Sequence, residues 1–64
     1  MSSTDMETYF VQVGRASVAI DFKAQALTVT LGAAPTVRTE DLGNGVLIDR
    51  DTRDGRIVSV EVIA

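Results

Sequence analysis

The last twenty residues constrain the fold of this chain more than any other part of it. Two apolar runs rich in β-branched residues, 46–48 and Ile57–Ile63, flank a polar segment that ends in Asp54-Gly55-Arg56. Apolar runs on either side of a short polar loop with an Asp-Gly pair are typical of a β-hairpin, because glycine adopts the positive φ that tight loops need. The sequence therefore predicts a C-terminal hairpin with strands over 46–50 and Ile57–Ile63.

Several shorter strand-like segments precede this hairpin. The clearest is 26–31, in which Leu27, Val29 and Leu31 alternate with threonines. Residues 17–21 also fit a strand, and 36–40 fits a polar edge strand because Val37 is its only apolar residue. The chain is therefore expected to be all-β. We predict a small antiparallel β-meander of about five or six strands that forms one domain over residues 1–64, with 1–5 as a flexible tail.

The N-terminal segment 6–13 fits two structures. Tyr9, Val11 and Val13 alternate along one face of a strand, whereas Met6 and Tyr9 also fall at helical spacing. The β-branched content favours a strand, and a short helix remains the alternative. The residues expected to be most buried lie in the later strands; they are Leu27, Val29, Ile48, Val58 and Val60.

The small size of the chain makes self-association an expected source of stability. A chain of 64 residues buries only about 60% of its unfolded surface, and this one has no cysteine and no histidine. Disulfides and the usual zinc, haem and iron–sulfur ligand sets are therefore excluded. The final strand places Val58, Val60 and Val62 on one face and isoleucines on the other, so that the N-terminal segment or a second subunit is needed as a cover. We also expect this last strand to be a free edge of the sheet, available for pairing with another chain. We therefore predict a homo-oligomer, with a dimer favoured.

Charge and hydropathy argue against several other partners. The net charge is −3, and the nine acidic and six basic residues are scattered, so no basic stripe indicates nucleic-acid binding. No apolar run approaches the ~20 residues that span a membrane. The N-terminus also lacks the basic and apolar regions of a signal peptide. A cytoplasmic protein that binds neither nucleic acid nor membrane is expected.

The acidic segment between the last two strands invites a calcium interpretation. Asp49, Asp51 and Asp54 could supply oxygen ligands before a glycine, as in an EF-hand loop. The spacing does not fit, because Asp54 follows Asp51 by three positions and the twelfth position is Val60 rather than glutamate. Two arginines in the segment also neutralise it. The sequence therefore predicts a solvated turn, with no metal-binding residues and no cofactor.

No catalytic residues are predicted. The carboxylates outside the loop have no reason to pair, the serines lack a histidine or an adjacent lysine as base, and Lys23 stands alone. Tyr9 and Phe10 are expected in the core rather than in a base-stacking platform. Residues 43–45 form a turn, too short to cradle phosphate. The carboxylates considered are Asp21, Glu40, Asp41 and Glu61. We expect the protein not to be an enzyme.

From Ile20 to the C-terminus the chain resembles DUF2283, a bacterial and archaeal family of short uncharacterised proteins. The matching segments are 24–31, 45–49 and 54–63, where Gly-Val-Leu-Ile-Asp and the closing hairpin strand are the most specific. The chain departs from the family pattern at three places. Gln25 stands where an acid is usual, Val37-Arg38-Thr39 replaces the usual Glu-Ser strand, and the hairpin loop is one residue longer. The resemblance implies an all-β fold and carries no agreed activity. Some members look like products of genes that sit beside toxin-like genes, which implies a partner-binding role.

These observations together predict a small non-enzymatic structural or interaction module that self-associates. The alternative is a small regulatory partner protein, similar to an antitoxin, that binds another protein by strand addition or through an apolar face.

Overall fold

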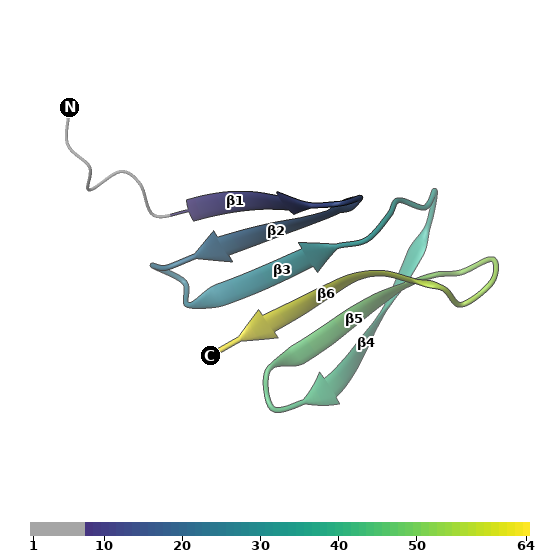
Figure 1. The fold of residues 1–64 in the computed structure, drawn as a ribbon. Helices are drawn as coiled ribbons and strands as arrows, with labels where there is room; N and C mark the ends of the chain where they lie inside the picture. Colours follow the sequence, from purple (N-terminus) through teal and green to yellow (C-terminus); the bar gives the residue numbers. More distant parts are fainter. Residues whose placement is uncertain (1–7) are drawn as a thin grey trace.

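The computed structural model describes residues 8–64, which form one antiparallel sheet and contain no helix (Figure 1). The six strands are β1 (Thr8–Val13), β2 (Ala16–Asp21), β3 (Ala26–Thr30), β4 (Val37–Gly43), β5 (Val46–Asp51) and β6 (Ile57–Ile63). The prediction of an all-β fold with a C-terminal hairpin is confirmed. Of the ambiguous N-terminal segment, the part that the structure describes is strand β1. The predicted tail over 1–5 lies outside the described residues.

The order of the strands across the sheet is β1-β2-β3-β6-β5-β4. Two three-stranded meanders, β1-β2-β3 and β4-β5-β6, therefore join where β3 pairs with β6. The last strand is central, so the expectation that it offers a free edge is wrong. It pairs with β3 because the segment 31–36 carries the chain past β6 and β5 to the far edge, and β4 and β5 then lead it back (Figure 1). The edges of the sheet are β1 and β4.

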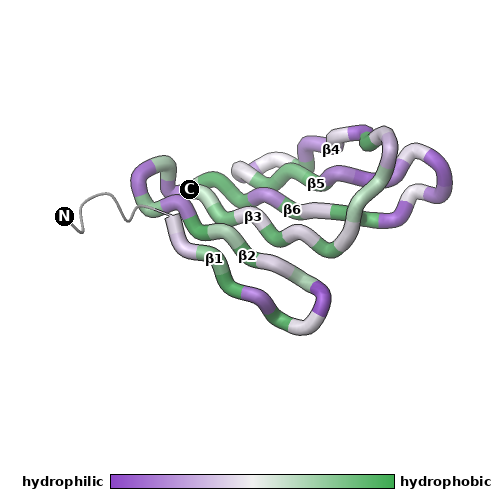
Figure 2. The backbone as a smooth tube through the Cα atoms, turned by 90° about the horizontal axis from the view of Figure 1, so that it is seen from above, coloured by the Kyte–Doolittle hydropathy of each residue, from purple (hydrophilic) through white to green (hydrophobic). Residues whose placement is uncertain are grey.

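Tight turns and bulges shape the two meanders. Gly14, with φ +60°, opens the two-residue turn between β1 and β2, a position that favours glycine. Strand β4 is exposed along its whole length, as expected of a polar edge strand, but it continues to Gly43 rather than ending at residue 40. Irregularities in pairing occur between Asp41 and Gly43 and again between Asp49 and Arg50. Figure 2 shows hydrophilic residues gathered at the turns at the ends of the sheet.

Strand register separates one apolar face from one polar face. Val18, Val29 and Val60 lie opposite one another on β2, β3 and β6, and Val11 and Ile48 continue the row on either side. Alternation places the neighbouring positions on the other face, where Ser17, Thr30, Ser59 and Asp49 form the corresponding row. We call the first side the apolar face. It consists of Tyr9, Val11, Val13, Val18, Ile20, Phe22, Leu27, Val29, Val46, Ile48, Val60 and Val62.

The buried core of this single layer is small. Among the described apolar residues, only Val58 and Ile48 are buried, at 4% and 8% exposure. Leu27, Val29 and Val60 are half-buried, so of the five residues predicted to be most buried only Ile48 and Val58 are confirmed as buried. They pack against neighbours within the sheet, but no second layer formed by residues 8–64 covers them. Strand β1 extends the sheet sideways instead of lying over it as a cover.

Candidate functional site

Asp51, at the end of β5, is the most buried residue in the described part of the chain, at 1% exposure. Its Oδ1 accepts hydrogen bonds from the backbone N–H of Arg53 at 2.9 Å and from Arg53 Nε at 3.1 Å. Arg53 Nη2 donates to Oδ2 at 2.7 Å, and Arg56 Nη2 reaches the same oxygen at 3.5 Å. The carboxylate is thus enclosed by donors from its own loop.

The backbone of this loop closes around the same residue. Asp51 N–H donates to the Arg56 carbonyl and Gly55 N–H to the Asp51 carbonyl, each at 2.8 Å. Asp54 Oδ1 accepts from Arg56 N–H, and Gly55 adopts φ +79°. The acidic segment is therefore a turn held mainly by its own groups, and Thr52 N–H ties it to the carbonyl of Thr36 before β4 at 3.3 Å. Residues 8–64 bring no three potential metal ligands into one cluster.

The arginine contacts fix the charge of Asp51. Hydrogen bonds from Arg53 lower the pKa of the Asp51 carboxyl to about 2, and the same contact raises the pKa of the Arg53 guanidinium. A carboxyl that is ionised at all pH values near neutrality and enclosed by donors is unsuited to take and release protons in catalysis. Its chemistry is that of a structural anion. The sequence pattern predicted a solvated turn here, so the burial of Asp51 was not predicted.

Asp49 ties three strands together on the polar face. Its carboxylate accepts hydrogen bonds from Thr39 Oγ1 on β4 at 2.6 Å and from Ser59 Oγ on β6 at 2.8 Å. Both hydrogen bonds lower the pKa of Asp49, and the bond from Thr39 has the larger effect. Ser59, one of the serines for which the sequence offers no catalytic base, is thus a structural hydrogen-bond donor.

Three of the other four carboxylates considered above make local contacts, and Glu40 and Asp41, although consecutive in β4, project from opposite faces of the sheet. Asp21 accepts the N–H groups of Lys23 and Ala24 in the turn after β2. Asp41 accepts from Gly43 N–H, and Glu40 pairs with Arg50 Nε at 3.0 Å. Glu61 lies on the polar face opposite Thr28 and Leu47. None of these contacts pairs two carboxylates.

The apolar face is the feature that no contact within residues 8–64 accounts for. Tyr9 is 51% exposed and Phe10, which projects from the other face, is 77% exposed, so the expectation that both lie in a core is wrong. Both belong to an edge strand of a one-layer sheet. The ring of Tyr9 meets that of Phe22 edge to face, with centroids 5.3 Å apart.

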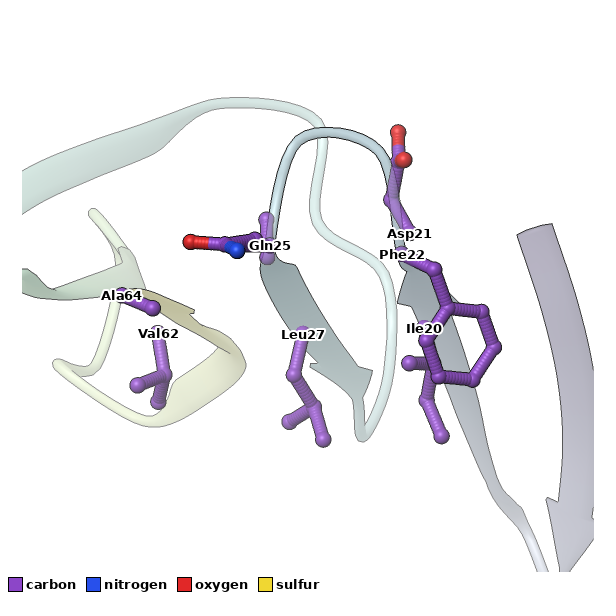
Figure 3. Close-up of a pocket in the computed structure, with 8 residues that line it drawn as sticks. Ile20, Asp21, Phe22, Gln25, Leu27, Val62 and Ala64 are labelled. Atoms are coloured by element: carbon purple, nitrogen blue, oxygen red, sulfur yellow. The ribbon is translucent and has the colours of Figure 1, made fainter. Parts of the chain in front are cut away.

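A hollow of about 500 Å³ opens on this face beside Phe22. Its lining includes Ile20, Leu27 and Val62, which project in the same direction from β2, β3 and β6, whereas Asp21 points the other way (Figure 3). The hollow is thus a gap between side chains of neighbouring strands in an apolar surface. Its apolar walls favour an apolar occupant.

Gly45 anchors the beginning of β5 against the end of the last strand. Its φ is +81°, and its carbonyl accepts a hydrogen bond from Ile63 N–H at 2.7 Å. A Cβ at this position would clash with the carbonyl oxygen of Ile63. The turn predicted over 43–45 is present, and the need for glycine at its third position depends on a strand that is distant in sequence.

The fold and these contacts define a small all-β protein built as a single sheet, with one apolar face and one face tied by structural carboxylates. A family model described as a protein of unknown function, DUF2283, matches residues 17–64. The chain therefore belongs to that family, and the match covers the span over which the sequence resembled it. Neither a curated protein nor a solved structure shows significant similarity to the chain. Residues 8–64 contain no helix long and apolar enough to cross a membrane.

Proposed function

We propose that the protein is a non-enzymatic interaction module that works as a self-associated unit, with the dimer as its basic state. The observation that carries this proposal is the uncovered apolar face. Tyr9, Val11, Phe22 and Val62 are all exposed there, on a sheet in which Ile48 and Val58 are the only buried apolar residues. A fold of this size with so little core gains stability by burying that surface against another chain.

The non-enzymatic part of the proposal is supported by how the polar residues are used. Asp49 and Asp51 are held in structural hydrogen bonds, and the charges of Glu40 and Arg50 are paired with each other. Within residues 8–64, no contact pairs two carboxylates, and the Ser59 hydroxyl beside Asp49 is used in a hydrogen bond that ties β5 to β6. The net charge of −3 likewise favours a protein partner over nucleic acid.

The regulatory alternative has one specific observation in its favour. Strands β1 and β4 are both edges of the sheet, and β1 exposes apolar side chains on both faces. An edge of this kind can accept a strand from another protein. A partner bound in this way would pair along the backbone of β1 and contact Phe10 or Val11, according to the face that its side chains cover.

The mass of the protein in solution tests the proposal. Each chain has a mass of 6.8 kDa, so gel filtration coupled to light scattering distinguishes one chain from two without ambiguity. We expect a dimer at tens of micromolar protein, with dissociation on dilution. A mass of one chain across this range contradicts self-association and favours the regulatory alternative. Co-purification with the product of a neighbouring gene then tests that alternative directly.

A further inference from the structure

We infer that the second copy docks face to face on the apolar face, so that β1, β2, β3 and β6 of the two chains form a two-layer β-sandwich. This inference rests on the proposed self-association and adds which surface carries it. Two other arrangements would also give a dimer, namely pairing of β1 edges and pairing of β4 edges. The two faces, the charges and the exposed area separate these possibilities.

The two faces of the sheet differ sharply in chemistry. Across β1, β2, β3 and β6 the apolar face has no charged side chain, and its central row is Val11, Val18, Val29 and Val60. The opposite face carries Asp21 and Glu61 within the same four strands. Only the apolar face can therefore be buried without removing charges from water.

The placement of charge also permits two identical copies to meet. Each chain carries a net charge of −3, which disfavours association if the acids face one another. The carboxylates of Asp49 and Glu61, however, lie on the polar face, and that of Asp21 caps a turn. On the apolar side the charged groups are confined to β4 and β5, where Glu40 is paired with Arg50 at 3.0 Å. These two strands therefore form the rim of the contact rather than its centre.

The available area fits a dimer contact. A whole aromatic side chain buries about 150–250 Å², so the exposed parts of Tyr9, Phe22 and the surrounding valines leave roughly 500 Å² of apolar surface in solvent. The half-buried residues of the central row add to this exposed apolar area. The total approaches the area of about 800 Å² that each partner buries in a specific complex. Pairing of two edge strands would satisfy backbone groups but leave this surface exposed.

The hollow beside Phe22 supports the same arrangement. A gap of about 500 Å³ among Ile20, Leu27 and Val62 is open in the single chain. Packed sheets lie about 10 Å apart and fill the space between them with interdigitating side chains from both layers. In a face-to-face dimer the apolar face of each copy meets the identical face of the other. The side chains of the second copy are therefore apolar and suited to occupy the hollow.

Two adjacent positions on β6 provide a matched test. Val62 is 39% exposed on the apolar face, and Ile63 is 41% exposed on the polar face of the same central strand. We expect Val62→Lys to weaken the dimer about 100-fold or more, because a charge would be buried between two apolar layers. Ile63→Lys should leave the mass by light scattering unchanged. Circular dichroism of both variants reports whether each one keeps the β-sheet signal.

A second measurement covers the case in which Val62→Lys does not fold. Because the chain has no cysteine, Val62→Cys and Ile63→Cys each introduce a single thiol at these positions. In the face-to-face dimer the thiol at 62 should react with a maleimide about 10-fold or more slowly than the thiol at 63, and dilution should remove the difference.

The outcomes separate the inference from the proposed function. A wild-type protein that stays a single chain contradicts both. A wild-type dimer that persists in Val62→Lys, with equal thiol reactivity at positions 62 and 63, contradicts the face-to-face contact alone and favours pairing of edges. A dimer lost in Val62→Lys and kept in Ile63→Lys, with protection of the thiol at 62, establishes the proposed surface.

Discussion

Gly45 and Ile63 meet so closely that their backbones leave no room for a side chain between them. The Gly45 carbonyl accepts the Ile63 N–H at 2.7 Å, while a Cβ on Gly45 would clash with the Ile63 carbonyl oxygen. The contact fixes the beginning of β5 against the end of β6. Glycine at this position is thus required by the packing of two strands as well as by its φ of +81°.

We therefore expect Gly45→Ala to lower the free energy of unfolding by about 2–3 kcal/mol, because it adds both backbone strain and a steric clash. Urea unfolding followed by circular dichroism measures the change. Gly55→Ala is the matched control, since Gly55 has a similar φ of +79° but nothing lies within 4 Å of an added Cβ. Equal losses in the two variants would show that φ alone, and not the approach of Ile63, makes glycine necessary.

Local patterns predicted most of the strands. Alternation of Leu27, Val29 and Leu31 with threonines marks β3, and the Asp54-Gly55 pair marks the turn between β5 and β6. These signals work because side-chain alternation and turn chemistry depend on neighbours in sequence. The resemblance to the family was predicted from the same segments and is confirmed over residues 17–64.

Features that depend on distant residues could not be predicted in this way. The pairing of Leu27 with Val62 makes β6 a central strand, and no local pattern distinguishes it from an edge strand. The burial of Asp51 depends on Arg53 folding back over the carboxylate, whereas an Asp-Arg-rich segment read alone indicates a solvated loop. The exposure of Tyr9 follows from the absence of a second layer in the described chain, which is a property of the whole fold.

The contact between Asp51 and Arg53 predicts a specific loss of stability in acid. The pKa of Asp51 is about 2 in the folded chain against an ordinary value of 3.8, so the ionised form stabilises the fold above pH 3.8. This stabilisation should be lost as the pH falls from about 3.8 towards 2, because the folded state must then take up a proton at a site that disfavours it. The free energy of unfolding, measured by urea titration at several pH values, should decrease across this window.

Two variants assign that pH dependence. Asp51→Asn removes the titrating group and should flatten the stability profile between pH 3.8 and 2 while lowering stability at neutral pH. Arg53→Gln removes the donors that lower the pKa of Asp51 and should flatten the same window. A profile as steep in both variants as in the wild type would show that other carboxyls cause the acid loss.

Divalent metal ions are expected to leave the protein unchanged. The oxygens of Asp51 already accept hydrogen bonds from Arg53, and the guanidinium groups of Arg53 and Arg56 would repel a cation from the loop. Titration with calcium, magnesium or manganese should therefore not shift the melting temperature. Because a ligand bound to the folded state raises stability, a reproducible rise of several degrees at sub-millimolar calcium would contradict this prediction.

The last prediction concerns two valines that differ in how far the sheet itself buries them. Val58 is 4% exposed, whereas Val60 is half-buried on the apolar face. Val58→Ala should lower the free energy of unfolding by about 1–3 kcal/mol at any protein concentration, because the cavity forms inside the single chain. Val60→Ala should cost less in dilute protein, because its side chain is partly in water there.

At concentrations where chains associate, the cost of Val60→Ala should rise towards that of Val58→Ala, since a second sheet would then cover Val60. Thermal unfolding of both variants over a wide range of protein concentration measures this difference. The Val58 variant is the internal control, because association leaves its environment unchanged. If the costs of the two substitutions keep a constant ratio at all concentrations in a protein that is dimeric by mass, Val60 stays exposed in the dimer and the contact must lie elsewhere.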